Sequence, residues 1–128
     1  MKNVVLDSSA LLALLHSEKG ADRLTPQLLS QATSSTVNLA EVQGKLIQRG
    51  LHPTDAWEAA LSPIRHATAF TEEHAKIAGK LVTVTRPLGL SLGDRACLAL
   101  GIVLDAEIYT ADSSWKKLKL DLIIHVIR

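Results

Sequence analysis

Four acidic residues differ from the other acids of the sequence because each lies among apolar or small residues, at or near a predicted junction between a strand and a helix. Most of the remaining acids have charged or polar neighbours, which is typical of a solvated surface. The four are Asp7 in Val-Val-Leu-Asp-Ser-Ser, Glu41 in Asn-Leu-Ala-Glu, Asp94 in Ser-Leu-Gly-Asp and Asp112 in Tyr-Thr-Ala-Asp.

Four carboxylates brought together would repel one another unless a positive charge lay between them. Arg95 is the only obvious internal neutraliser within the four segments, so a divalent cation fits better. Oxygen ligands without a nearby Cys or His cluster select Mg²⁺ or Mn²⁺ over zinc. Such an ion lowers the pKa of bound water, orients it and stabilises a leaving oxygen, which is the chemistry of hydrolytic phosphoryl transfer.

Each acid taken alone also has a purely structural explanation as a helix cap. Two have the spacing of a capping box and two have the position of an N-cap. The boxes are Asn38 with Glu41 and Ser91 with Asp94, and the single caps are Asp7 and Asp112. The catalytic interpretation is favoured because the four acids are expected to lie together: the carboxyl ends of parallel strands meet at one edge of a sheet. Asp94 is the one acid that does not directly follow a predicted strand.

The apolar pattern predicts strands that alternate with helices along the whole chain. Strands are expected at 4–6, 34–37, 67–70, 107–110 and 122–127. Helices are expected at 10–15, 21–31, from Asn38 to a stop at Gly50, and at 53–61, 71–84, 92–104 and 113–118. This order predicts the three-layer α/β/α class with a mostly parallel central sheet. We find no repeat or linker, so residues 1–128 are expected to form one domain.

Composition and charge indicate what kind of protein the chain is and how it could bind a nucleic acid. The 128 residues carry a formal charge of +1 and are 47% hydrophobic, which indicates one soluble globular domain without need of disulfides. Near-neutral charge disfavours a broad basic face, so any nucleic-acid binding should be local or metal-assisted. Cys97 is the only cysteine and is expected to be a small buried hydrophobe. With no signal peptide and no membrane-spanning run in the sequence, a cytoplasmic location is expected.

The four acidic segments, in their order and spacing, resemble the motifs of the PIN-domain ribonucleases, and among these the VapC-type toxins of bacterial and archaeal toxin–antitoxin pairs. Asp7 with Ser8 is similar to the first motif, an aspartate that ends strand one before a small hydroxyl residue. Glu41 is similar to the second, a glutamate at the head of a helix, and Asp94 and Asp112 to the third and fourth. The resemblance covers the whole chain.

This resemblance implies that Asp7, Glu41, Asp94 and Asp112 hold one or two Mg²⁺ or Mn²⁺ ions and activate water against an RNA phosphodiester. It implies product ends with a 3′-hydroxyl and a 5′-phosphate. Ser8 or Thr110 is a candidate to orient a ligand carboxylate. Arg95 is a candidate to contact the scissile phosphate, or alternatively is a surface helix residue or a partner of Asp94. A short basic run could steer RNA or form a solvated helix face; it consists of Lys116, Lys117 and Lys119.

The family resemblance also implies a homodimer and a cognate antitoxin. The C-terminal segment of that antitoxin would cover the acidic site, often by inserting an Arg or another basic side chain. Trp57 and Leu61, on the helix predicted after Pro53, are candidate partner contacts or, alternatively, core residues.

Two other functions remain as alternatives. A phosphoacceptor signalling domain would have an acidic pair after the first strand and a Lys after the last, and Asp7-Ser8 and Val126-Ile127-Arg128 supply neither. A PIN-like binding scaffold without activity usually lacks some of the four acids, and all four are present. No Gly-rich phosphate loop, no G-x-S-x-G elbow and no metal-spaced histidine pair occurs.

Overall fold

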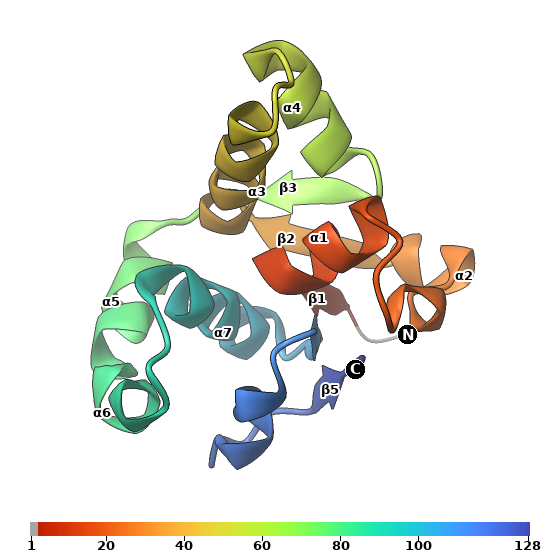
Figure 1. Ribbon diagram of the computed structural model, residues 1–128. Helices are drawn as coiled ribbons and strands as arrows, with labels where there is room; N and C mark the ends of the chain where they lie inside the picture. Colours follow the sequence, from red (N-terminus) through yellow and green to blue (C-terminus); the bar gives the residue numbers. More distant parts are fainter. Residues whose placement is uncertain (1–2) are drawn as a thin grey trace.

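The computed structural model describes residues 3–128 and, within them, holds a central sheet of five short strands (Figure 1). The strands are β1 (Val4–Leu6), β2 (Ala32–Ser35), β3 (His66–Thr68), β4 (Glu107–Thr110) and β5 (Ile124–Val126). They are ordered β3-β2-β1-β4-β5, and every neighbouring pair is parallel. The predicted parallel α/β/α class is therefore confirmed.

Helices connect consecutive strands and cover both faces of the sheet (Figure 1). The α-helices are α1 (Ser8–Leu15), α2 (Pro26–Leu29), α3 (Thr36–Gln48), α4 (Pro53–Leu61), α5 (Glu72–Lys80), α6 (Val82–Thr85) and α7 (Leu92–Leu104). Short 3₁₀ helices are η1 (Ala21–Arg23), η2 (Arg86–Leu88) and η3 (Ser113–Lys117). No helix in the described residues is long and apolar enough to span a bilayer.

The central strand β1 is buried on both sides, because its side chains alternate between two apolar cores. Val4 and Leu6 pack into one core with residues of α1, α3 and α4, whereas Val5 packs into the other with residues of α7. Full burial of a Val or Leu side chain contributes roughly 1.5–3 kcal/mol. The first strand therefore anchors both layers of helices, and Cys97 is buried in the α7 layer as expected.

The second strand and the helix after it lie two residues earlier than predicted. β2 consists of Ala-Thr-Ser-Ser, which has little apolar character, yet all four residues are buried. Its hydroxyl groups have partners: Ser34 Oγ donates to the Leu6 carbonyl (2.8 Å) and Thr33 Oγ1 to the His66 carbonyl (2.8 Å). Ser35 then caps α3 by accepting from the Val37 amide. A polar strand satisfied by its neighbours is not visible in the sequence as an apolar run.

Four other segments also differ from the sequence prediction. The helix expected over 21–31 is η1 followed by α2, because Thr25 forms a new N-cap and Pro26 begins a new helix. The helix expected over 71–84 divides at Leu81 into α5 and α6, where a run of β-branched residues lowers helix propensity. The last predicted helix is the 3₁₀ helix η3, and the last strand is shortened to Ile124–Val126.

Because all strands are parallel, the carboxyl ends of β1, β2 and β4 lie at the same edge of the sheet. Helices α1 and α3 begin at this edge, directly after β1 and β2. Helix α7 packs against β1, β2 and α3. The architecture thus brings three helices and the segment after β4 around one edge.

Gly20 supplies a test of how the loop after α1 meets the residue that follows β5. Its φ is 94°, and a Cβ there would overlap the carbonyl of Ile127. We expect Gly20→Ala to lower the free energy of unfolding by about 1–3 kcal/mol. Gly44→Ala is the matched control, since that helical glycine has open space around it and the change should stabilise by about 0.5–1 kcal/mol. Equal effects of the two changes in urea unfolding would contradict this account.

Candidate active site

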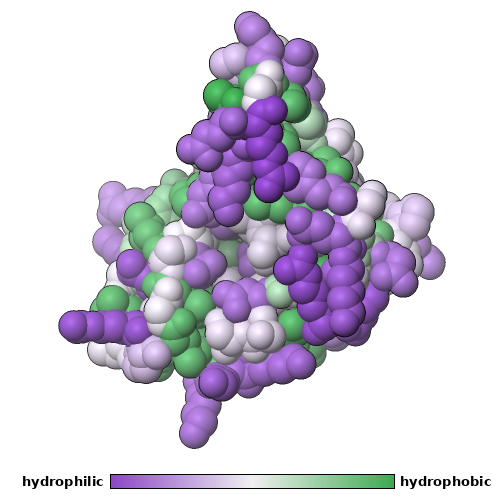
Figure 2. Space-filling view, viewed as in Figure 1, coloured by the Kyte–Doolittle hydropathy of each residue, from purple (hydrophilic) through white to green (hydrophobic). Residues whose placement is uncertain are grey.

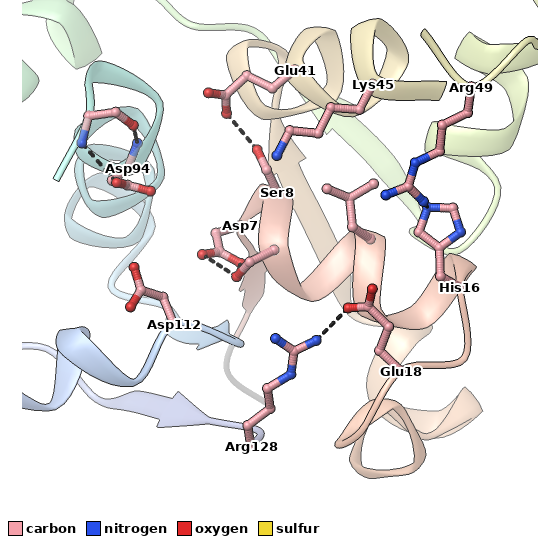
Figure 3. Close-up of a pocket in the computed structure, with 13 residues that line it drawn as sticks. Asp7, Ser8, His16, Glu18, Glu41, Lys45, Arg49, Asp94, Asp112 and Arg128 are labelled. Atoms are coloured by element: carbon pink, nitrogen blue, oxygen red, sulfur yellow. Dashed lines mark hydrogen bonds and ion pairs between the residues drawn. The ribbon is translucent and has the colours of Figure 1, made fainter. Parts of the chain in front are cut away.

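The four acids singled out in the sequence line one cavity of about 370 Å³ at the carboxyl edge of the sheet (Figure 3). Each comes from a different part of the fold: Asp7 from the β1–α1 junction, Glu41 from the second turn of α3, Asp94 from the first turn of α7 and Asp112 from the segment after β4. Figure 3 shows their side chains gathered around the same opening. The structure therefore brings together all four, including Asp94, which follows no strand directly.

Asp7 is the most buried member of the cluster and is held by hydrogen bonds. Its carboxylate caps α1 by accepting from the Ala10 amide (2.8 Å), and it also accepts from the hydroxyls of Ser9 (2.8 Å) and Thr110 (2.5 Å). Burial raises the pKa of Asp7 from 3.8 to about 6, and the charge of Asp94 adds to the rise, while these hydrogen bonds oppose it. The fold thus holds a carboxyl group where ionisation is costly.

Glu41 does not form the predicted capping box with Asn38, because the N-cap of α3 is Ser35 and Asn38 lies inside the helix. Glu41 Oε1 instead accepts from the Ser8 hydroxyl (2.5 Å) and from Asn38 Nδ2 (3.1 Å). Asn38 Nδ2 also lies 3.1 Å from the Gly93 carbonyl oxygen of α7. Asn38 therefore joins α3 to α7 and orients Glu41 at the same time.

Asp94 forms the predicted capping box and also lines the cavity. Its carboxylate accepts from the Ser91 amide (2.8 Å), and its own amide donates to Ser91 Oγ (3.2 Å). Burial raises the pKa of Asp94, and the charges of Glu41 and Asp112 raise it further. Capping and membership of an acidic site are therefore compatible roles for the same residue.

Asp112 begins η3 as the predicted N-cap, accepting from the amide (3.0 Å) and hydroxyl (2.8 Å) of Ser114. Its backbone is tied to the central strand, because the Asp112 amide donates to Thr110 Oγ1, which in turn donates to Asp7. The two aspartates thus share Thr110 as a common support.

The carboxylates influence one another through space. Negative charge raises the pKa of Asp7 and Asp94, and the same field reaches Cys97 beneath the site, whose thiol pKa is raised first by burial and then by Asp7, Asp94 and Glu41. A cation in the cavity would offset this repulsion. The cluster is therefore electrostatically suited to positive charge.

The donor set fits a hard divalent cation in kind, since it consists of carboxylate oxygens without cysteine or histidine. Within residues 3–128, however, no three acidic, histidine or cysteine side chains are already gathered tightly enough to form a metal site. Each carboxylate is instead held by hydrogen bonds to nearby residues. These hydrogen bonds set where each carboxylate lies at the cavity wall.

Some site residues are not predicted from the sequence. The sequence indicates only a capping role for Asn38 and does not single out Gly93, although a Cβ at Gly93 would overlap the carboxylate of Glu41. The signal for Gly93 is a glycine directly before a candidate acid, a position where a close approach can require the absence of a side chain. Ser8 and Thr110, expected to orient acids, contact Glu41 and Asp7 respectively.

The remaining sequence candidates lie elsewhere. Arg95 Nη1 donates to the Ala78 carbonyl of α5 (2.9 Å), and Arg95 does not line the cavity. Trp57 and Leu61 are half-buried and pack against the core that contains β1. The lysines after β4 also lie outside the cavity lining; they are Lys116, Lys117 and Lys119.

Comparison with known proteins gives a consistent result. A model of the PIN domain family matches residues 4–120. No curated protein matches the sequence.

Among solved structures, the fold is similar to a chain of a DNA-bound VapBC from Salmonella typhimurium, with a TM-score of 0.76, 12% identity and 100% of both chains covered. It is similar to a chain of a toxin–antitoxin complex from Klebsiella pneumoniae, with a TM-score of 0.73, 17% identity and 98% of both chains covered. A chain of VapBC2 from Rickettsia felis bound to a promoter DNA fragment gives a TM-score of 0.69 at 16% identity, with 95% of this chain and 96% of that chain covered.

The raised pKa of Asp7 predicts how metal-free stability depends on pH. In EDTA at pH 7 the folded state holds an ionised Asp7 whose burial favours the protonated form, so we expect Asp7→Asn to stabilise the fold by about 1–3 kcal/mol. The Thr110 hydroxyl can reverse to accept from the new amide. The gain should shrink as the pH falls from about 6 to below about 4, where Asp7 is protonated in both states.

Thermal or urea unfolding across this pH range measures the effect. Asp121→Asn is the control, because Asp121 is exposed and outside the cavity. If the gain for Asp7→Asn is the same at both ends of the range, or if the variant is less stable at pH 7, burial of the charge does not govern the stability of the metal-free fold.

Proposed function

Since the chain belongs to the PIN domain family of nucleases, we propose that it is a metal-dependent endoribonuclease and the toxin of a type II toxin–antitoxin pair. The observation that carries the proposal is the convergence of Asp7, Glu41, Asp94 and Asp112 on one cavity. Capping alone would not require four acids from four separate elements to face the same opening. The neighbours from Salmonella and Klebsiella, described as VapBC or toxin–antitoxin complexes, support the toxin role and a protein partner.

In the proposed reaction the four carboxylates would hold Mg²⁺ or Mn²⁺, which would activate water and stabilise negative charge on the phosphoryl and leaving oxygens. The residues around them keep the carboxylates in place. Ser9 and Thr110 hold Asp7, while Ser8 and Asn38 hold Glu41. Water adds to phosphorus as the bond to the 3′-oxygen breaks, which leaves a 3′-hydroxyl and a 5′-phosphate.

The same proposal includes RNA as substrate, a cognate antitoxin that covers the acidic cavity, a homodimer and a cytoplasmic place of action. An antitoxin that supplies a basic side chain would neutralise the carboxylates as the cation does.

The phosphoacceptor alternative agrees less well with the fold, because signalling domains of that class have the strand order 2-1-3-4-5 rather than β3-β2-β1-β4-β5.

Cleavage of a mixed cellular RNA pool tests the activity. We expect discrete fragments with Mn²⁺, none with EDTA, and a loss of at least about 100-fold in Asp94→Asn, since a carboxylate ligand is removed. Asp105→Asn at the other end of α7 is the matched control: Asp105 is exposed, and Asn accepts its φ of 48°. Full activity of Asp94→Asn would refute the assignment of the site. Absence of cleavage by the native chain on every RNA tested would favour the scaffold alternative.

Gly93→Ala tests the position of Glu41 without removing any acid. The new methyl group would displace the Glu41 carboxylate, so we expect cleavage to fall about 10- to 100-fold, as for other supports of metal ligands. We also expect a smaller rise in melting temperature on adding Mn²⁺, since an ion that binds only the folded state stabilises it. Gly79→Ala on α5, where a Cβ meets nothing, is the control. A native Mn²⁺ response in Gly93→Ala would contradict the role of this glycine.

A further inference from the structure

The cavity that holds the four acids also has a basic side. Its lining continues from Ser8 and Leu12 to a set of cationic or titratable side chains, which are His16, Lys45, Arg49 and Arg128. Figure 3 shows Lys45 extending from α3 toward Ser8, whereas Arg49 lies beside His16, farther from Asp94 and Asp112. Figure 2 shows hydrophilic surface bordering the hollow on this face. One cavity therefore joins an acidic side to a basic side.

Helix α3 places both kinds of charge on the same face. Glu41 and Lys45 lie in α3 and Arg49 is its C-cap; the three are spaced by four residues, so successive positions are about 6 Å apart along the helix axis. A Glu and a Lys at this spacing commonly form an ion pair. Here Glu41 is turned toward Ser8 and Asn38, and Lys45 forms no salt bridge with an acid of residues 3–128. The Lys45 ammonium group is therefore available to a ligand.

Arg49 is held without being neutralised. Its Nη1 donates to His16 Nε2 (2.5 Å), so α1 fixes the guanidinium through a nitrogen rather than through a carboxylate. Arg128 differs, because its guanidinium pairs with Glu18 and its charge is balanced within the cavity. Among the cations that line the cavity, Lys45 and Arg49 thus carry the uncompensated positive charge.

We propose that Lys45 and Arg49 bind backbone phosphates of the RNA strand that flank the phosphate at the four acids. This inference rests on the proposed ribonuclease function and adds the path that the bound RNA takes across the cavity. Phosphate is the ligand that suits an ammonium and a guanidinium aligned on one helix face. A polyanion that reaches the acids through a bound cation would continue directly onto this basic side. The lysines after β4, which the sequence also offers for this role, do not line the cavity.

Binding of a fluorescein-labelled single-stranded oligouridylate, measured by anisotropy with Mg²⁺ present, tests the proposal. All proteins carry Asp94→Asn, so that the RNA stays intact. Adding Lys45→Ala and Arg49→Ala should weaken binding roughly tenfold or more and reduce the slope of log affinity against log salt by about 1.4, which is two contacts at about 0.7 each. Oligoadenylate should show the same loss, because phosphate contacts carry no sequence information.

The control replaces Lys116 and Lys117 by Ala in the same background and removes the same charge outside the cavity. An unchanged slope in this control, with the loss confined to the α3 variant, supports the proposal. An equal loss in both, or native affinity in the α3 variant, overturns it; in the second case an acidic protein segment would be the better occupant for this side. Failure of the native chain to cleave any RNA tested, with the salt effect retained, would favour the scaffold alternative and leave this RNA-binding surface supported.

Discussion

The burial of the Asp7 carboxylate at the end of the central strand is the constraint around which the site is organised. A charged oxygen pair can be kept there only if donors surround it. The amide of Ala10 and the hydroxyls of Ser9 and Thr110 supply them. These donors come from the start of α1 and the end of β4, so the groups that stabilise the charge also fix the relative positions of two strands. The position of the loop that carries Asp112 follows from that arrangement.

The rest of the site depends on small and amide side chains in the same way. Asn38 reaches Ser8, Glu41 and the backbone of α7, and thereby sets how closely three helices meet. Gly93 permits the Glu41 carboxylate to lie directly against α7. Repulsion among the acids is accordingly opposed by a network of neutral hydrogen-bond donors rather than by lysine or arginine. This leaves the negative charge uncancelled and open to a cation.

Much of this architecture is predictable from the sequence. The strands at Val4–Leu6 and Glu107–Thr110 and the helices at Pro53–Leu61 and Leu92–Leu104 have the predicted bounds, because each is a clear apolar pattern with a cap or breaker at its end. The prediction places β2 two residues too late, because hydroxyls bonded to neighbouring strands replace the apolar side chains that would mark the strand. It also fails at Asn38, since the partners of its amide lie on other helices. The four acids are identifiable from their unusual neighbours, but the contacts that hold them depend on residues distant in sequence.

The basic side of the cavity illustrates the same limit. Lys45 and Arg49 resemble ordinary solvated helix residues until α1 and α3 are seen to enclose one opening, whereas the lysines after β4 attract notice in the sequence because they follow an acid in the chain. Spacing within one helix is readable from sequence, but the direction in which that helix faces is a property of the whole fold.

Helix α3 carries Glu41 near its start, Lys45 one turn later and Arg49 at its C-cap, so one helix sets the backbone positions of the acid and the two cations. If the helix tilts, all three shift together and their separation stays constant. An RNA strand lying along this face would meet charged groups spaced about one helical turn apart. The number of nucleotides between a phosphate bound by Lys45 or Arg49 and the cleaved phosphodiester bond would then be set by this helix and would not depend on the motion of loops.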